Sequence, residues 1–535
     1  MKNKLTQYLK WDQYHYWYEF GGLALCILFP LFVSGYILTL DLVFTPHVAF
    51  PLEITNAWLL QVALWLCHFV LPMDLIEKCI LFVILLCSGA GMYRLFLVLY
   101  DRTRSLRIGA YFAGLFYMIN PFVYSRFMAG QWMVLLGYAL LPFCIRSLYL
   151  FVQSPSLGRA ISVTMWMVIM VSVSLHMVGI AVVAMGILLI AMYDHKWNKH
   201  HLQGLVIIVA VPALLSGFWL VPAMFGVGTI GESVTSFTKD HFAAFETVGG
   251  IGSVLRLQGF WVEARDLYVL PQAIVPLWGI WFLVLWGVVL FGIKHYLKTQ
   301  RPLAIGLIVF IIIGVVVSTM PFIPWVSQLI PQLAGYREPH KFVSLIAMSY
   351  AIFGGIGAIR IVSYWHEKHS EITVTAVKVS VLVLPIIITP VMFWGFGGQL
   401  TPKAYPPEWY SANRLLKDQA RTTKTLFLPW HQYANYSFSD RIIANPSEKF
   451  FETAIVASDQ PEFKNLTPTR PDSLKRAVSD VLGDKKNVSG RLKQTGIDFI
   501  ILAKEQDYRD YVYLDKDPGL ITIQENAKLK IYKVK

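Results

Sequence analysis

Charged residues are scarce in this sequence: Asp, Glu, Lys and Arg make up 15% of it, while apolar residues make up 56%. Soluble globular proteins carry about 25% charged residues, so a chain that is soluble throughout is excluded. In place of the missing charges there are apolar runs that exceed the roughly 18 residues a membrane-spanning helix needs. The sequence therefore predicts a polytopic α-helical membrane protein.

Cysteine is also rare. The five cysteines lie in or beside apolar segments and lack metal-ligand spacing: Cys26, Cys67, Cys79, Cys87 and Cys144. Neither a disulfide framework nor a zinc site is predicted. The net charge of +13 does not indicate nucleic acid, because many basic residues fall in short loops on one predicted side of the membrane.

Eleven apolar segments are predicted to span the membrane. They lie near residues 21–40, 78–100, 108–126, 132–150, 160–176, 177–194, 204–224, 273–294, 302–320, 342–362 and 374–396. With a cytoplasmic N-terminus, every second loop carries Lys or Arg, as the positive-inside rule requires. This orientation places the C-terminal region outside the cytoplasm. The protein as a whole is predicted to be integral to the plasma (cell) membrane. The shorter apolar stretch 58–71 is predicted to be a helix along the outer membrane surface.

The composition changes after residue 396, and the remaining residues carry about half of all charged residues, mixed in sign. We expect two domains: a transmembrane domain, 1–396, and a soluble extracytoplasmic α/β domain, 397–535. The predicted strands of the second domain are 424–429, 496–503, 520–524 and 529–534, and its predicted helices are 407–420 and 473–482.

Asp41 is the first candidate site residue, because it follows the first apolar segment at the predicted outer face. His47 and Glu53 follow in the same loop. A carboxylate at this place can act as a general base toward an acceptor hydroxyl, or hold a divalent metal ion. The alternative is an aspartate that only ends a helix in the headgroup layer.

A second candidate segment, Asn120 to Trp132, is predicted to be a turn at the outer face. Arg126 in this turn departs from the positive-inside trend, which suggests pairing with a phosphate. The alternative is an interfacial arginine whose side chain extends to the headgroups.

The third candidate is the sequence Arg337-Glu338-Pro339-His340-Lys341, at the start of the tenth predicted span. Two cations, a carboxylate and an imidazole at a helix N-terminus suit a lipid-linked phosphate or diphosphate. The alternative is a charged interfacial anchor in which Arg337 pairs with Glu338. The long outside loop, about 226–269, is a further candidate for substrate gating.

These features together resemble the GT-C glycosyltransferases, which include oligosaccharyltransferase catalytic subunits and arabinofuranosyltransferases. The shared features are an acidic residue after the first span, a surface helix in the first outer loop, eleven spans and an outer C-terminal domain. The segments 120–132, 237–261 and 337–342 also resemble multi-span proteins of the YfhO group. Many GT-C enzymes carry an Asp-x-Asp or Glu-x-Asp pair in the first loop, whereas Leu42 and Val43 follow Asp41 here.

The resemblance implies transfer of a sugar from a polyprenyl-phosphate donor to a hydroxyl of a glycan or glycolipid acceptor. Asp41 would be the base, and Arg337, Lys341, Glu338, His340, Arg126 and His47 would bind substrate. No cofactor follows with certainty; a divalent cation, Mg²⁺ or Mn²⁺, is left open. A non-enzymatic exporter or assembly factor that binds a lipid headgroup is the main alternative, and a scaffold that only binds glycans is another.

Overall fold

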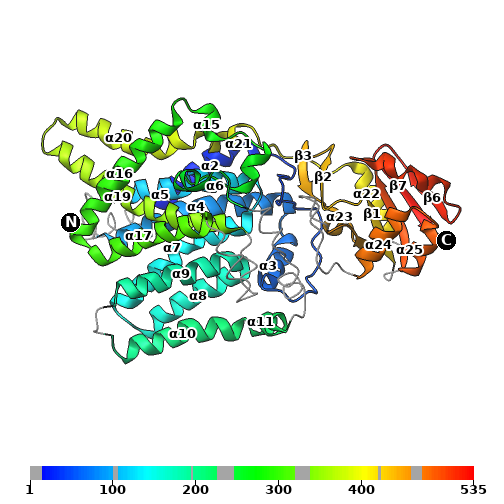
Figure 1. The fold of residues 1–535 in the computed structure, drawn as a ribbon, viewed down its shortest axis with the longest axis horizontal. Coiled ribbons are helices and arrows are strands. Elements are labelled where there is room, and N and C mark those ends of the chain that lie inside the picture. Colours follow the sequence, from blue (N-terminus) through cyan, green and yellow to red (C-terminus); the bar gives the residue numbers. More distant parts are fainter. Residues whose placement is uncertain are drawn as a thin grey trace.

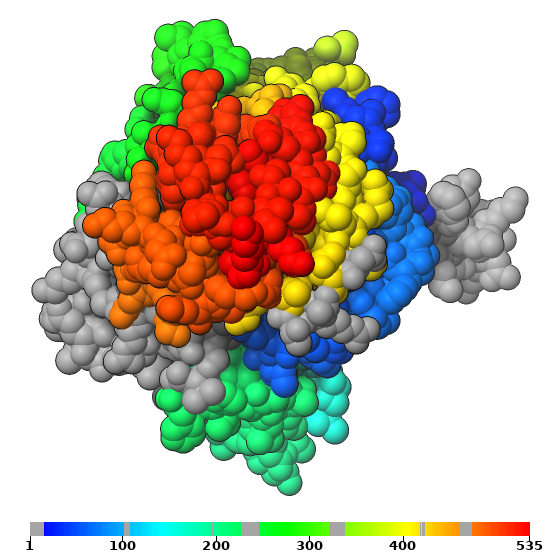
Figure 2. Space-filling view, turned by 90° about the vertical axis from the view of Figure 1, so that its right-hand side faces the viewer, coloured from blue at the N-terminus to red at the C-terminus, as the bar shows by residue number. Residues whose placement is uncertain are grey.

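The computed structural model describes residues 15–100, 107–193, 197–225, 246–319, 338–417, 419, 423–459 and 473–535. Helices extend along most of the length of the molecule, and a small sheet with short helices lies at the end that holds the C-terminus (Figure 1). Seen from that end, the yellow-to-red C-terminal region covers the middle of the molecule (Figure 2). The prediction of a mainly helical chain with a C-terminal α/β region is confirmed.

Long apolar helices pack side by side in the helical part: α2 (His15–Leu28), α4 (Met73–Leu99), α5 (Arg107–Met118), α7 (Trp132–Gln153), α8 (Leu157–Val173), α9 (Leu175–Ala191), α10 (Lys199–Leu215), α11 (Gly217–Met224), α16 (Trp278–Thr299), α17 (Arg301–Thr319), α19 (Val343–His366) and α20 (Glu371–Ile388). Every residue of α19 from Val343 to Ile359 is buried, so this part of the helix lies at the centre. It approaches α16 closely at glycine: a Cβ on Gly357 would lie 2.0 Å from the Val288 carbonyl oxygen.

Six helices of the described part are long and apolar enough to cross a membrane: 73–99, 132–153, 278–299, 301–319, 339–366 and 371–388. Helices α10 and α11 form one further candidate, bent by 74° at the break between them. The other predicted spans coincide with shorter helices. Eleven spans and their orientation therefore stay predictions.

The first predicted span, 21–40, is wrong in extent. Helix α2 ends at Leu28, a 3₁₀ turn η1 (Phe29–Leu31) follows, and the chain then leaves the helical conformation. Pro30 cannot donate a backbone hydrogen bond, and Gly35 has a φ of +116° that favours glycine. Asp41 consequently lies in an irregular segment, residues 32–57, hereafter the Asp41 segment, and does not end a helix.

Two carboxylates at the start of α4 hold the beginning of the Asp41 segment. The Gly35 amide donates to Asp74 Oδ2 at 3.0 Å, and the Ile37 amide donates to Glu77 Oε2 at 2.9 Å. These bonds replace the backbone pairing that a continued helix would have supplied. The stretch predicted along the membrane surface does form a helix, α3 (Trp58–His68), whose placement in a membrane stays a prediction.

The segment predicted as the end of the third span and a following turn contains a separate short helix at residues 121–128. This is α6 (Pro121–Met128), whose first turn is capped by the Asn120 side chain accepting from the Val123 amide at 3.1 Å. Asparagine before proline is a favourable helix start, because proline needs no hydrogen-bond acceptor for its nitrogen.

The C-terminal region contains a five-stranded sheet in the order β4-β1-β5-β7-β6. Its strands are β1 (Lys424–Leu428), β4 (Ala454–Val456), β5 (Ile497–Ala503), β6 (Leu520–Glu525) and β7 (Leu529–Val534), with β4, β1 and β5 parallel and the others antiparallel. Helices α22 (Pro407–Lys417), α24 (Ser473–Asp484) and α25 (Val488–Gln494) accompany it. The predicted strands and helices are confirmed. A hairpin of β2 (Tyr433–Tyr436) and β3 (Arg441–Ala444), the strand β4, and the short helices α23 (Ser447–Phe450) and α25 were not predicted.

The C-terminal region is bonded along the Asp41 segment. Tyr36 and Lys403 exchange two backbone hydrogen bonds of 2.8 Å, and the Tyr405 hydroxyl donates to the Phe44 carbonyl at 2.9 Å. One apolar core also includes residues of both regions. The Asp41 segment therefore lies between the helices and the C-terminal region; a separate domain beginning at residue 397 stays a prediction.

Candidate active site

Asp41 is held by backbone contacts with the turn after α6. Its amide donates to the Ala129 carbonyl at 3.0 Å. Gly130, the residue after Ala129, has a φ of +74°, and a Cβ placed on it would lie 2.3 Å from the Leu42 nitrogen. Only glycine permits this approach without strain. The local sequence thus brings two segments, far apart along the chain, into direct backbone contact at Asp41.

A small apolar cluster supports that contact from a third direction. Leu40 and Ala129 pack with Phe260, Trp261 and Val262, all buried. The last three belong to the long loop between α11 and α16, and Trp261 begins the short 3₁₀ helix η3 (Trp261–Arg265). The cluster therefore fixes Asp41 against α6 and against the part of this loop that the structure describes.

The Asp41 carboxylate is partly exposed and is approached by groups of both charges. Its Oδ1 accepts from the Tyr433 hydroxyl at 2.9 Å. Desolvation by the surrounding protein, together with the nearby Glu338 carboxylate, raises the pKa of Asp41, whereas hydrogen bonds from Tyr433 and Gln131 and the charge of Lys341 lower it. A carboxylate whose pKa is raised is a stronger base than an ordinary aspartate.

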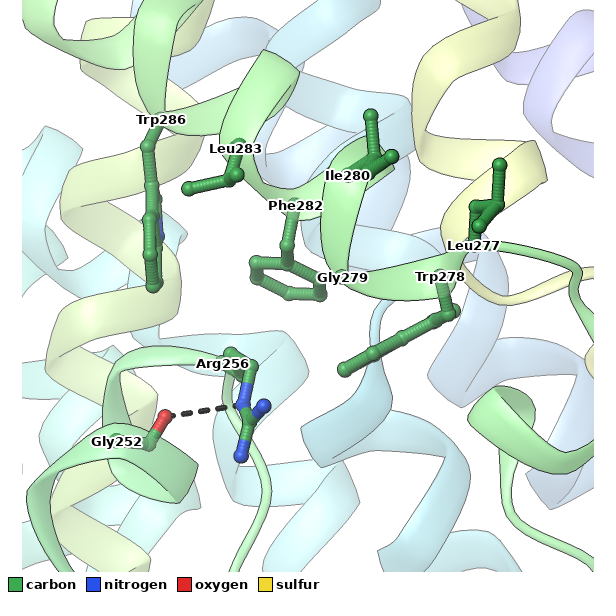
Figure 3. A pocket seen from close by; sticks show the side chains of 9 residues that line it. All are labelled: Gly252, Arg256, Leu277, Trp278, Gly279, Ile280, Phe282, Leu283 and Trp286. Atoms are coloured by element: carbon green, nitrogen blue, oxygen red, sulfur yellow. Dashed lines mark hydrogen bonds between the residues drawn. The ribbon is translucent and has the colours of Figure 1, made fainter.

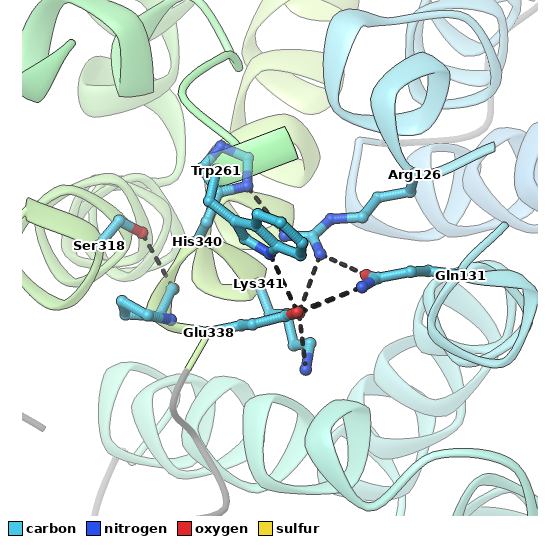
Figure 4. A network of polar contacts seen from close by, with 8 residues as sticks. Arg126, Gln131, Trp261, Ser318, Glu338, His340 and Lys341 are labelled. Carbon is cyan, nitrogen blue, oxygen red and sulfur yellow. Dashed lines mark hydrogen bonds and ion pairs between the residues drawn. The ribbon is translucent and has the colours of Figure 1, made fainter. Parts of the chain in front are cut away.

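Glu338 is the centre of a buried polar cluster (Figure 4), and its charge acts on Asp41. Its carboxylate lies 3.2 Å from the Arg126 guanidinium and 3.0 Å from Lys341 Nζ. It also accepts from the Gln131 amide at 3.3 Å and from the Trp261 indole at 3.2 Å. Two cations around one carboxylate leave a formal charge of one positive unit, and the Asp41 and Glu263 carboxylates lie close enough to interact with this cluster.

Arg126 is wholly buried, which a cation tolerates only with partners. Besides Glu338 it bonds the Gln131 side chain, and its guanidinium carbon lies 3.8 Å from the Phe260 ring centroid. The alternative interpretation, an interfacial arginine extending to lipid headgroups, is wrong, because this side chain is wholly buried and pairs with Glu338. Arg126 orients Glu338 and Gln131.

His340 is bonded through both ring nitrogens. Nδ1 lies 3.0 Å from the Arg126 guanidinium, which can only donate, so Nδ1 must accept. Nε2 then carries the hydrogen and donates to the Gln258 carbonyl at 3.0 Å. His340 is consequently neutral and supplies no positive charge, and the expectation that it strengthens an anion site is not supported by this geometry.

The structure therefore brings together five of the predicted site residues: Asp41, Arg126, Glu338, His340 and Lys341. His47 instead contacts the C-terminal region, with its Nε2 3.7 Å from Glu452 and 3.5 Å from Asn413. Arg337 lies outside the described residues, and the predicted Arg337–Glu338 pair with it; Glu338 pairs with Arg126 and Lys341.

Some contributors were missing from the prediction. Gln131 and Trp261 lie in segments that the sequence singled out, but neither is charged, so neither was chosen. Glu263, in the same loop as Trp261, accepts from the Ser125 hydroxyl at 2.7 Å and the Gly259 amide at 2.8 Å. Burial raises the pKa of Glu263, and these two bonds lower it. Nothing in the sequence marked Tyr433, because its proximity to Asp41 depends on the tertiary fold.

An apolar groove is lined in part by residues of the loop that contains Trp261 (Figure 3). It has a volume of about 550 Å³ and lies between α14 (Gly250–Leu255) and the beginning of α16. The lining residues are Gly252, Arg256, Leu277, Trp278, Gly279, Ile280, Phe282, Leu283 and Trp286. Arg256 is its cation, and two residues further along the chain Gln258 bonds His340. The groove and the Glu338 cluster are thus joined by a few residues of one loop.

Among the described residues, no three His, Cys, Asp or Glu side chains are grouped as metal ligands. Asp41 has Lys341 near it and no acidic neighbour two positions away in the sequence. The divalent cation stays a prediction.

Comparison with known proteins gives the family. Residues 62–513 match the family model described as alpha-(1->3)-arabinofuranosyltransferase, N-terminal GT-C domain. Asp41 lies before the matched range. A search of curated proteins found no match.

Solved structures of an arabinofuranosyltransferase share the fold. The cryo-EM structure of the arabinofuranosyltransferase AftD from Mycobacteria superimposes with a TM-score of 0.66 at 16% identity, over 97% of this chain and 40% of that one. Its mutant R1389S, class 2, gives 0.64 at 15%, over 97% and 41%. The oligosaccharyltransferase AglB from Archaeoglobus fulgidus gives 0.42 at 11%, over 91% and 65%. This chain therefore spans about 40% of the length of the AftD structure. By its family match, the chain belongs to the GT-C membrane glycosyltransferase family of α-(1→3)-arabinofuranosyltransferase N-terminal domains.

Proposed function

We propose that this chain transfers a sugar from a polyprenyl-phosphate donor to an acceptor hydroxyl at the outer membrane face, with Asp41 as the general base. The observation that carries the proposal is the position of Asp41, a partly exposed carboxylate held beside a buried cluster of net positive charge. Family membership supports arabinofuranose as the sugar and an α-(1→3) bond as the product.

The reaction needs one proton transfer and one displacement. Asp41 takes the proton of the acceptor hydroxyl, the acceptor oxygen bonds the anomeric carbon, and the bond from that carbon to the phosphate oxygen breaks. Polyprenyl phosphate leaves with the bonding electron pair. A positioned base contributes about 10²–10⁴-fold to such a step, and alignment of the two substrates contributes further.

Lys341 is the cation that stabilises the leaving phosphate, because charge develops there as the bond breaks. Arg126 is wholly buried and acts indirectly, by holding Glu338 and Gln131. Arg337 keeps the phosphate-binding role predicted from the sequence. His47, which contacts Asn413 and Glu452, is assigned to the acceptor side, where the C-terminal region orients a glycan or glycolipid.

The groove between α14 and α16 supplies a place for the lipid chain of the donor. Its lining is nearly all apolar, and its volume of about 550 Å³ is within the range of ligand sites. Arg256 lines the groove, and two residues further along the chain the Gln258 carbonyl bonds His340 of the Glu338 cluster. We propose that the phosphate of a lipid in this groove lies toward the Glu338 cluster, to which the loop from Arg256 to Gln258 leads. The divalent cation has no assigned step in this reaction.

The test is sugar transfer by purified full-length chain in lipid nanodiscs, with polyprenyl-phosphate-linked arabinofuranose as donor and an arabinan oligosaccharide as acceptor. Asp41→Asn keeps the shape and removes the base, so transfer should fall at least about 100-fold while donor binding is retained. Asp266→Asn, at an exposed position in the outer loop, is the matched control and should transfer normally. Transfer by Asp41→Asn at the wild-type rate would refute the assignment. Donor that is bound but never transferred by the wild type would favour the binding or export alternative.

A further inference from the structure

The β2–β3 hairpin of the C-terminal region reaches Asp41 through two bonds at once. Tyr433 and Ala444 are paired across the hairpin, at its open end. The Ala444 amide donates to the Leu40 carbonyl at 2.8 Å, and the Tyr433 hydroxyl donates to Asp41 Oδ1 at 2.9 Å. Because the register places both groups side by side, one rigid element fixes both the backbone before Asp41 and its carboxylate.

Helix α23 adds a third contact from the same region. Lys449 Nζ lies 3.5 Å from the Val43 carbonyl, and the Lys449 carbonyl accepts from the Thr45 hydroxyl at 3.0 Å. The Lys449 charge attracts the Asp41 carboxylate. The next residue, Phe450, is buried against Trp409, with ring centroids 5.3 Å apart, so the position of Lys449 is set by the core of the C-terminal region.

We propose that the C-terminal region completes the active site, and that Tyr433 is the positioning residue that orients the Asp41 carboxylate for proton transfer. The inference rests on the proposed function of Asp41. The Tyr433 proton occupies Oδ1, so the carboxylate is held in one orientation and the proton of the acceptor goes to Oδ2. The charge of Lys449 favours the ionised form of the carboxylate.

This role has a consequence for pH dependence. The groups that act on Asp41 are Glu338, which disfavours the ionised form, and Lys341, Lys449, Gln131 and Tyr433, which favour it. Loss of the Tyr433 hydroxyl therefore raises the pKa of Asp41 further. The acidic limb of the activity profile, where the base becomes protonated, should then move to higher pH.

The experiment compares Tyr433→Phe with the wild type in nanodiscs, using the arabinofuranose donor and arabinan acceptor across pH. The variant keeps the ring and should fold. We expect the acidic limb to move upward, with transfer at a fixed pH on that limb reduced roughly tenfold and the alkaline plateau changed far less. Tyr513→Phe is the control, since the buried Tyr513 hydroxyl has no hydrogen-bond partner among the described residues, and its profile should match the wild type.

An acidic limb that stays in place in Tyr433→Phe would overturn the inference, whether the rate is normal or lowered equally at every pH. If the wild type transfers no sugar, the proposed function fails, and thermal unfolding then decides the Tyr433–Asp41 contact separately. Tyr433→Phe should lower the midpoint in the wild type and have little effect in an Asp41→Ala background. Equal effects in both backgrounds would show that the two residues are not coupled.

Discussion

Two carboxylates close together in this protein have opposite surroundings. Glu338 is buried and accepts from four side chains: Arg126, Gln131, Trp261 and Lys341. Asp41 is partly exposed, and its carboxylate accepts from Tyr433 and Gln131. A carboxylate occupied by four donors has little capacity left to take a proton from a substrate. Glu338 is therefore suited to hold the site together, and Asp41 to react.

The two carboxylates also differ in which segments of the chain supply the groups around them. Around Glu338 they come from α6, the turn after it, the loop between α11 and α16, and the residues before α19. Around Asp41 they include Tyr433 and Lys449 from the C-terminal region. The helical part thus builds the charge cluster largely by itself, whereas the candidate base depends on both regions.

Removing the charge at the centre of the cluster should have the largest effect on stability. Glu338→Gln keeps the shape but leaves Arg126 and Lys341 buried without their anion. Breaking a buried ion pair in this way costs about 3–5 kcal/mol. Thermal unfolding in one detergent, with Glu371→Gln as the exposed control, measures this difference. If both variants unfold at the same temperature, the cluster does not stabilise the protein and the comparison with Asp41 fails.

A smaller effect is expected from the contact that positions Asp41. Gly130→Ala adds a Cβ that would lie 2.3 Å from the Leu42 nitrogen, at a φ of +74°. Such backbone strain costs on the order of 1–3 kcal/mol. Gly186→Ala, in the middle of α9 with nothing within 4 Å of the new atom, is the matched control and should be neutral or slightly stabilising. Equal unfolding midpoints for the two variants would show that the turn after α6 adapts without strain.

The sequence predicted the helical membrane part, the four long strands and most members of the site, because hydrophobic period and charge position are local signals. The sequence grouped Asp41 with Lys341, and the two are near each other. It wrongly predicted Asp41 at the end of a helix, since Pro30 and Gly35 end the helix early. Two features were beyond its reach. The pairing of Glu338 with Arg126, rather than with its neighbour Arg337, is a contact between residues 212 positions apart. Tyr433 approaches Asp41 across 392 positions, and only the folded hairpin register brings it there.

The smallest expected effect is the pH dependence of stability at Asp41, and its sign tests the comparison directly. Desolvation and Glu338 raise the pKa of Asp41 in the folded state above its value in the unfolded chain. The folded state then binds the proton more tightly, so the stability contributed by Asp41 is full below the unfolded pKa, about 4, and is lost as pH rises through the folded pKa. The side chain at position 41 in the Asp41→Asn variant does not titrate. The unfolding midpoint of this variant should therefore rise relative to that of the wild type as pH increases from about 4 toward 8.

The opposite sign is expected at Asp440, whose pKa the Lys403 hydrogen bond lowers. The stabilising contribution of Asp440 is present above the unfolded pKa and is lost as pH falls. The unfolding midpoint of Asp440→Asn should therefore fall relative to that of the wild type as pH rises. Because Asp440 is exposed, the change should be slight. Midpoints of the three proteins, measured in one detergent from below about pH 4, where Asp440 titrates, up to about pH 8, compare the two aspartates directly. A fall of Asp41→Asn relative to the wild type with rising pH would mean that Lys341, Lys449 and Tyr433 outweigh desolvation, and that Asp41 is, like Glu338, a carboxylate held mainly as a structural anion.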